Sequence, residues 1–201
     1  MLEIGAAYGV ATQVALKKGC YVIANDLDKR HLKILWQRTP ARLKTHLKLL
    51  PGSFPNKIRM APNSVGAVLA CRVLHFLDGP TLEKGLKKIF GWLAPGGCFV
   101  MVAETPYLRN WLSFLPVYEK RCKKGSKWPG LIKQPWKYNK TTTQHDLPKL
   151  IHFMDVEVLK RALSKTGFEI KKLHYLSRKN FPKEIRLDGR ESVGAVCIKP
   201  V

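Results

Sequence analysis

The chain has 201 residues, of which 45% are hydrophobic and 25% charged, values typical of a globular domain and not of a disordered protein. Lysine and arginine total 36 and aspartate and glutamate 14, so the formal net charge of +22 should attract polyanions. No apolar run approaches the roughly 18 residues of a membrane span, and residues 1–9 do not resemble a secretory signal. The five cysteines are widely spaced, which favours a protein of the reducing cytoplasm over one with a disulfide framework or a zinc site.

The first 106 residues alternate short apolar strands with helical segments. Val10 and Val14 share one face of a first helix, and Asp28 is a predicted N-cap for a second helix whose Leu32, Leu35 and Trp36 face inward. Strands are predicted at residues 2–4, 21–25, just before Gly52, and at 64–70 and 98–103, with a helix that begins near Pro80 and contains Leu82, Leu86, Ile89 and Leu93. This alternation predicts a parallel sheet with helices on both faces.

The second half interrupts this rhythm at residues 107–154, which we call the insertion. Its first part predicts one amphipathic helix, from the apolar side chains of Trp111, Phe114, Leu115 and Tyr118. A helix capped by Asp155 and ended by Gly167 follows, and two last strands are predicted at residues 168–176 and 192–199. We therefore expect one domain over residues 1–201, with the insertion as a lid or a substrate-binding segment.

Residues 120–140 contain eight lysine or arginine side chains, no acidic residue, and the aromatic residues Trp128, Trp136 and Tyr138. Basic residues interleaved with aromatic ones are typical of single-stranded nucleic-acid binding. A solvated loop is the more common structure for such a run, and the sequence favours the loop.

The stretch Glu3-Ile4-Gly5-Ala6-Ala7-Tyr8-Gly9 carries the most chemical information. A strand ending in a carboxylate enters a turn in which Gly5 and Gly9 let the backbone approach a ligand closely. Asp26, at the end of the second strand, is suited to grip ribose hydroxyls at the carboxyl edge of the sheet. The spacing differs from the dinucleotide pattern, and Glu3 would repel a pyrophosphate but accept an ammonium group. A nucleoside that carries an amino acid, S-adenosylmethionine, fits these residues.

The chain resembles the class I S-adenosylmethionine-dependent methyltransferase family, over about residues 2–106 and 153–201. The family's E/D-x-G-x-G-x-G motif matches Glu3 to Gly9, with Ala7 in place of the middle glycine, and its ribose-binding acid matches Asp26. Its LxPGG turn matches Leu93-Ala94-Pro95-Gly96-Gly97, and its late helix-to-strand step matches Leu163 to Phe168. The resemblance implies a Rossmann-like α/β fold with a seven-stranded, mostly parallel sheet, helices on both faces and an antiparallel last strand.

The resemblance also implies a set of cofactor-binding residues on the loops after the first four strands. Ser53 stands where the family usually has an acid near the adenine, Phe54 offers a stacking face, and Cys71 makes a backbone contact. The family usually places a helix before the first strand, whereas this sequence begins inside it, so either the start lies upstream or the insertion supplies the lid. The implied cofactor contacts are Glu3, Gly5, Ala6, Ala7, Tyr8, Gly9, Asp26, Leu27, Ser53, Phe54 and Cys71, and no metal is implied.

In this family the sulfonium makes the cofactor's methyl group electrophilic, so the protein mainly aligns the acceptor for in-line attack and excludes water. A hydroxyl or protonated amine acceptor also needs a base. His75 and Glu104, near the ends of the fourth and fifth strands, are the candidate bases, and Tyr107 is a candidate for orienting the acceptor.

Three functions follow from these observations. The first is methyl transfer to a small-molecule acceptor. The second is methylation of nucleic acid, RNA in particular, which the charge of +22 favours, although the Asn-Pro-Pro-Tyr and Pro-Cys motifs of base methylation are absent where Cys71-Arg72-Val73-Leu74 stands. The third is a non-catalytic protein that binds the cofactor on the same fold.

Overall fold

The computed structural model describes residues 1–139 and 147–201, and within them the chain forms a seven-stranded sheet in the order β3-β2-β1-β4-β5-β9-β8. Every neighbouring pair is parallel except those made by β9, which is antiparallel to both β5 and β8. The strands are β1 (Leu2–Ile4), β2 (Val22–Asp26), β3 (Leu47–Pro51), β4 (Val65–Cys71), β5 (Leu93–Glu104), β8 (Glu169–Leu176) and β9 (Ser192–Ile198). The predicted fold class, a mostly parallel Rossmann-like sheet with an antiparallel last strand, is confirmed.

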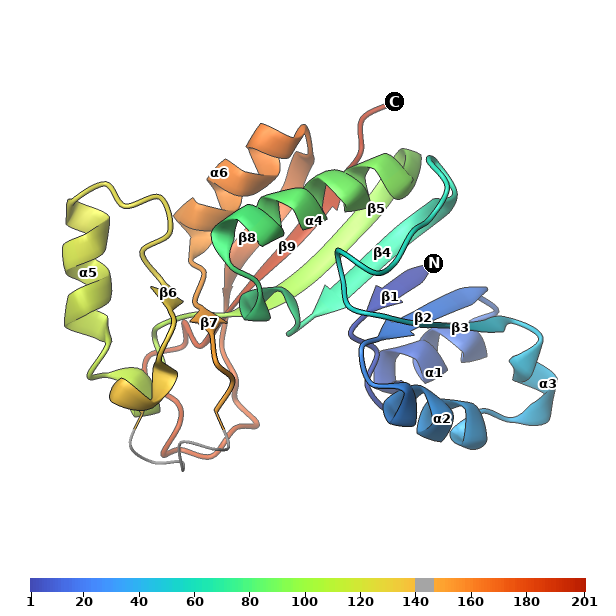
Figure 1. Cartoon of the computed structure of the whole chain (residues 1–201), viewed down its shortest axis with the longest axis horizontal. Helices are drawn as coiled ribbons and strands as arrows, with labels where there is room; N and C mark the ends of the chain where they lie inside the picture. The colour runs from blue at the N-terminus through green and yellow to red at the C-terminus, as the bar shows by residue number, and fades with distance from the viewer. Residues whose placement is uncertain (140–146) are drawn as a thin grey trace.

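Helices cover both faces of the sheet (Figure 1). One face carries α1 (Val10–Lys17), α2 (Lys29–Arg38) and α3 (Ala41–Lys44), which pack through a small cluster that includes Leu16, Leu32, Leu35 and Leu47. The other face carries α4 (Gly79–Trp92) and α6 (Val156–Thr166), which bury the largest cluster, with Leu86, Ile89, Phe99 and Leu163 at its centre.

The predicted helix ends are confirmed where a side chain or a glycine specifies them. Asp28 accepts a hydrogen bond from the Arg30 amide at 2.8 Å, and Asp155 accepts one from the Val158 amide at 2.7 Å. Gly167 ends α6 in the left-handed conformation, with φ of 101°. These helix ends depend only on the local backbone and one side chain or glycine, so they could be predicted from the sequence.

Two predictions about burial and bounds were wrong. Trp36 was expected to face inward but is 38% exposed, because α2 buries Leu32 and Leu35 and the Trp36 ring lies instead beside the ammonium group of Lys44. In α1 the buried residues are Thr12 and Leu16, and the face that Val10 and Val14 share is exposed. Strand β5 begins at Leu93 and not at Cys98, because the Leu93–Gly97 turn continues the ladder to β4 through a register shift.

The insertion follows β5, beyond the carboxyl end of that strand, and lies at the far side of the molecule from α1–α3 (Figure 1). It contains η2 (Arg109–Trp111), α5 (Leu115–Lys123), β6 (Leu131–Ile132), η3 (Pro135–Lys137) and β7 (Ile151–His152). The single helix expected from Trp111 to Tyr118 is divided, since Pro116 occupies the first turn of α5 and the chain before it forms η2. Residues 140–146 of the insertion, which include the end of the basic segment, lie outside the described residues.

The insertion has a hydrophobic core of its own. Trp111, Phe114, Tyr118, Ile132 and Phe153 are buried together there. Edge-to-face packing joins Trp111 to Phe153, with ring centroids 5.0 Å apart. The aromatic stripe seen in the sequence is therefore core. Within residues 120–139, the basic segment includes the end of α5, β6 and η3 and is not a free loop.

Candidate active site

The turn between β1 and α1 has a backbone that only small residues allow. Gly5 and Gly9 have φ of 71° and 81°, and a Cβ at Gly5 would lie 2.8 Å from the side chain of Val73, while one at Gly9 would lie 2.1 Å from that of Leu35. Ala7, between them, also has a positive φ of 47°. An L-residue there is strained by about 1–2 kcal/mol, which is the cost of having alanine where a glycine would relax.

Asp26 at the end of β2 fixes this turn from the neighbouring strand. Its Oδ2 accepts the Ala7 amide at 2.8 Å, and its Oδ1 accepts the Asp28 amide at 2.9 Å and lies 3.3 Å from Nδ1 of His31. The side chain is buried, so these amides hold the carboxylate in one orientation. The loops after β1 and β2 are thereby joined through one acid.

Glu3 and Thr12 form a second buried pair below the turn. The Thr12 hydroxyl donates to a carboxylate oxygen of Glu3, and both side chains are inaccessible to solvent or nearly so. Burial raises the pKa of Glu3, and the Thr12 hydrogen bonds only partly oppose that shift. Glu3 thus lies under the turn and connects it to the first turn of α1.

A cavity of about 530 Å³ opens at the carboxyl ends of β1 to β4, next to these residues. Its volume lies in the usual range for small-molecule sites. Six of the predicted cofactor contacts line it, namely Gly5, Ala7, Asp26, Leu27, Ser53 and Phe54. The other predicted contacts lie nearby but not in the lining: Glu3, Ala6, Tyr8, Gly9 and Cys71.

Several residues that line the cavity were not among the predicted cofactor contacts. Asn25 donates from its amide to the carbonyls of Leu50 and Gly52, both at 2.8 Å, and so sets the path of the loop after β3. Asp28 and His31 reach the cavity from the start of α2, and Arg72, Val73, Phe76 and Leu77 reach it from the loop after β4. Their position directly after a strand was the available clue, because such loops meet at one edge of the sheet.

None of the three candidate catalytic residues lines the cavity. His75 lies in η1 (Leu74–Phe76), is buried, and has no hydrogen-bond partner for Nδ1 among the described residues. Burial lowers the pKa of His75 to about 4, so the ring is neutral at pH 7 and its conjugate acid is strong. It can accept a proton there only as a weak base.

Glu104 lies between two arginines at the end of β5. Its Oε1 is 2.8 Å from Nη2 of Arg72 and 3.0 Å from Nη2 of Arg178. Burial raises the pKa of Glu104, but the charges of Arg178 and Arg72, together with the hydrogen bond from Arg72, outweigh burial, and the pKa lies below its usual value. Glu104 therefore mainly holds Arg72 and Arg178 in place, and its lowered pKa makes it a weak proton acceptor.

Tyr107 packs at the base of the insertion. The guanidinium of Arg190 lies over its ring at 3.7 Å from the centroid, and Tyr118 and Tyr175 meet it edge to face. Burial raises the pKa of Tyr107, so its hydroxyl stays protonated at neutral pH. Its contacts link the insertion to β8 and to the segment that precedes β9.

The insertion touches the loop that leads from the cavity to α4 without lining the cavity through any of its described residues. Nδ1 of His152 lies 2.9 Å from the carbonyl of Leu77, and Trp128 packs against Gly79, where a Cβ would lie 2.1 Å from the indole nitrogen. Leu77 itself lines the cavity. One loop therefore separates the insertion from the candidate site.

Two features of other site classes are missing from the described part of the chain. Nowhere in residues 1–139 and 147–201 do three or more histidine, cysteine, aspartate or glutamate side chains gather in a way that could hold a metal ion. Over the same residues, no helix has both the length and the apolar character needed to cross a bilayer.

Comparison with known proteins points to one family. A family model described as a methyltransferase domain matches residues 2–101, about half of the chain. A comparison with curated proteins gave no match.

Solved structures with the same fold are numerous. A methyltransferase from Mesorhizobium loti that depends on S-adenosylmethionine has a TM-score of 0.71 and 17% identity, and the alignment covers 98% of this chain and 89% of that one. A second such enzyme from Methanosarcina mazei has a TM-score of 0.68 and 16% identity, with 100% and 92% covered. The glycopeptide N-methyltransferase MtfA, complexed with S-adenosylhomocysteine, has a TM-score of 0.64 and 16% identity, with 99% and 80% covered.

Proposed function

Because the chain belongs to the class I S-adenosylmethionine-dependent methyltransferase family, we propose that it transfers a methyl group from S-adenosylmethionine to a small-molecule acceptor. One observation carries the cofactor assignment. The buried carboxylate of Asp26 is fixed by the Ala7 amide in the wall of a cavity of about 530 Å³, beside the glycine turn. A carboxylate oxygen keeps further lone pairs when it accepts one amide, so Asp26 can still accept ribose hydroxyls.

The lining fits the parts of this cofactor. Asp26 is suited to the ribose, and Ser53 and Phe54 offer a hydroxyl and a ring on the adenine side. Gly5 keeps the turn free of a side chain. Glu3 lies beneath the turn, outside the cavity lining and hydrogen-bonded to Thr12, and we assign it as the acid for the ammonium group. When bound, S-adenosylmethionine supplies an electrophilic methyl group on a sulfonium.

The residues of this chain then align the acceptor and exclude water, which supplies most of the rate in a direct displacement. His75 is the candidate base, with Glu104 and Tyr107 as candidate residues for charge and orientation. Since the pKa of His75 is about 4 and Glu104 is paired with two arginines, we infer an acceptor atom that is nucleophilic without a strong base.

Calorimetric titration of S-adenosylhomocysteine tests the cofactor assignment. Asp26→Asn keeps the shape of the side chain but removes its charge, and we expect at least a tenfold loss of affinity. Glu169→Ala, which removes an exposed carboxylate on β8, is the matched control and should bind like the parent protein. Equal affinity in Asp26→Asn and the parent would contradict the site.

A second candidate function, methylation of RNA, is favoured by the net charge of +22. Binding of S-adenosylhomocysteine without transfer to any small-molecule or RNA pool would instead favour a non-catalytic cofactor-binding protein.

A further inference from the structure

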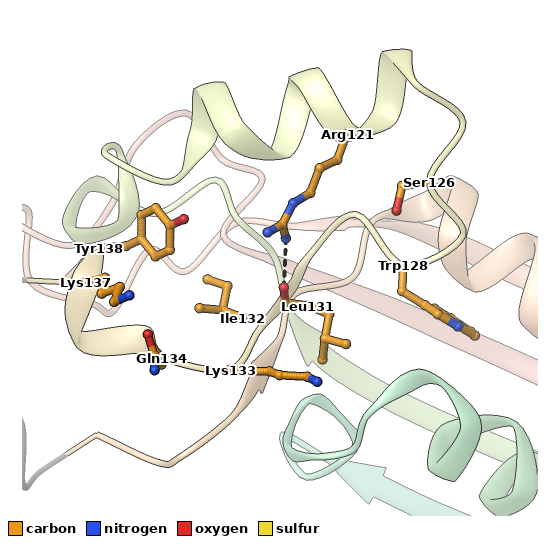
Figure 2. A pocket seen from close by; sticks show the side chains of 9 residues that line it. All are labelled: Arg121, Ser126, Trp128, Leu131, Ile132, Lys133, Gln134, Lys137 and Tyr138. Atoms are coloured by element: carbon orange, nitrogen blue, oxygen red, sulfur yellow. Dashed lines mark hydrogen bonds between the residues drawn. The ribbon is translucent and has the colours of Figure 1, made fainter.

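A second cavity, of about 610 Å³, lies within the insertion between α5 and the segment from β6 to η3 (Figure 2). Arg121, Lys133 and Lys137 supply three positive charges to its lining, and Trp128 and Tyr138 supply two aromatic rings near its two ends (Figure 2). None of the lining residues is acidic. The cavity shares no lining residue with the candidate cofactor cavity.

The charge of Arg121 is fixed in place without being neutralised. Its Nη1 donates to the carbonyls of Pro129 at 3.0 Å and Leu131 at 2.8 Å, and its guanidinium lies over the ring of Phe114. These partners are neutral, and no carboxylate in the part of the chain that the structure describes forms an ion pair with it. A pre-positioned arginine of this kind is well suited to a phosphate.

The two lysines add exposed charge at the rim. Neither Lys133 nor Lys137 forms a salt bridge with another described residue. The charge of Lys133 is one of the causes that lower the pKa of Asp78, but the Asp78 carboxylate already accepts the Thr81 amide at 2.9 Å as the N-cap of α4. The mouth of the cavity is thus strongly positive, and it belongs to a protein whose net charge is +22.

The aromatic residues give the cavity flat apolar surface beside these charges. Tyr138 is half-buried and packs edge to face against Phe114, with ring centroids 5.0 Å apart, so its position is fixed by the core of the insertion. Trp128 is fixed by His152 at 5.0 Å and flanked by Lys127 and Arg161. Fixed rings next to phosphate-binding side chains are the pattern by which proteins hold single-stranded nucleic acid.

We propose that this cavity binds a nucleotide unit of single-stranded RNA, with Arg121, Lys133 and Lys137 on the phosphate and Tyr138 against the base. The contacts of Trp128 with Gly79 and of His152 with Leu77 place the cavity one loop away from the candidate cofactor site. A bound strand would therefore pass close to that site. Binding itself needs no cofactor and no methyl transfer.

The test is fluorescence anisotropy with a labelled twelve-nucleotide oligouridine, without cofactor, over a series of salt concentrations. For the double variant Lys133→Glu/Lys137→Glu we expect at least a tenfold weaker affinity. The plot of log affinity against log salt should become less steep by about 1.4, because each lost contact to a single-stranded phosphate removes about 0.7 from the magnitude of its negative slope. Lys17→Glu/Lys18→Glu, at the C-terminal end of α1 on the opposite side of the molecule, makes the same change in net charge and should change affinity less than twofold (Figure 1).

Uridine monophosphate as a competitor distinguishes a free nucleotide from a strand. If uridine monophosphate displaces the oligonucleotide only at a concentration far above that of the oligonucleotide, the result supports a strand as the ligand. Displacement at an equal concentration supports a free nucleotide in the same cavity and contradicts the strand. Lys133→Gln/Lys137→Gln, which removes charge without reversing it, should show a smaller loss in the same direction. Equal losses in the insertion variant and the α1 variant, or no binding at low salt, would overturn the proposal.

Discussion

Arg178 and Glu104 lie 74 residues apart in the sequence, and Nη2 of the first is 3.0 Å from Oε1 of the second. Both side chains are largely buried, at 9% and 15% exposure. The contact ties the end of β5 to the segment that follows β8. It also leaves the carboxylate dependent on arginine charge, because burial alone would raise the pKa of Glu104.

Arg178→Met should therefore lower the free energy of unfolding by about 3 kcal/mol, as expected when one member of a buried ion pair is removed. Urea denaturation at pH 7 measures the change. Lys171→Met breaks the exposed pair with Glu169 and should cost at most about 1 kcal/mol. An equal decrease in the free energy of unfolding in both variants would show that the buried pair stabilises the fold no more than the exposed pair.

Two buried histidines make the fold sensitive to mild acid. Burial lowers the pKa of His75 and of His152 to about 4 each, below the ordinary value of 6.5. In the unfolded chain these histidines become protonated below about pH 6.5, whereas in the folded chain they stay neutral down to about pH 4. The free energy of unfolding therefore decreases as the pH falls from 6.5 to 4. We expect a loss of about 2 kcal/mol per histidine between pH 7.5 and pH 5.

Urea denaturation at the two pH values checks this, and His75→Gln should remove about half of the loss. His174→Gln, on the partly exposed strand β8, should leave it unchanged. Glu104 and Glu191, whose carboxylates are stabilised by arginine charge and by backbone amides respectively, add acid sensitivity only below about pH 4.5. A flat profile from pH 7.5 to 5 would contradict the burial of the histidines.

Ala7→Gly should stabilise the protein by up to about 1 kcal/mol, because the positive φ of 47° costs alanine more than glycine. Part of that gain is offset by the greater entropy of glycine in the unfolded chain. Thermal unfolding measures the result. Ala6→Gly, at a buried neighbour without a positive φ, should destabilise instead. The same sign for both variants would exclude backbone strain as the cause.

Phe114→Ala should destabilise the insertion locally and leave the candidate cofactor site intact. Phe114 is fully buried in the cluster with Trp111 and Phe153, and its truncation costs about 3–5 kcal/mol locally. Hydrogen exchange should accelerate in residues 107–139, whereas the affinity for S-adenosylhomocysteine should change less than twofold. A large loss of that affinity would show that the insertion supports the cofactor site directly.

The sequence was informative where one residue or its neighbours decide the structure. The glycine turn, the N-caps at Asp28 and Asp155, and the placement of Asp26 at a strand end all follow from local backbone geometry and the order of the strands. The alternation of strands and helices predicted a parallel sheet covered on both faces, and the family resemblance implied its seven strands and its antiparallel last strand.

The sequence was uninformative where distant segments decide the environment. No sequence feature near Glu104 identifies Arg178 as its partner. Arg72 directly follows β4 and so lies at the carboxyl edge of the sheet, but the sequence does not show that it lines the candidate cofactor cavity. Trp36 and Val14 continue an apolar helical pattern, yet they remain 38% and 59% exposed. The insertion was predicted as a break in the rhythm of strands and helices, but the division of its helix and the pairing of β6 with β7 were not predicted.

That separate core has a consequence for how the protein can diversify. Because Trp111, Phe114, Tyr118 and Phe153 pack mainly against one another, the described part of the insertion can exchange its surface residues without disturbing the strands that carry Gly5 and Asp26. The surface of the insertion and the turn that contains Gly5 can therefore change independently of each other. Substitutions can accumulate on the first while the backbone geometry of the second stays as it is.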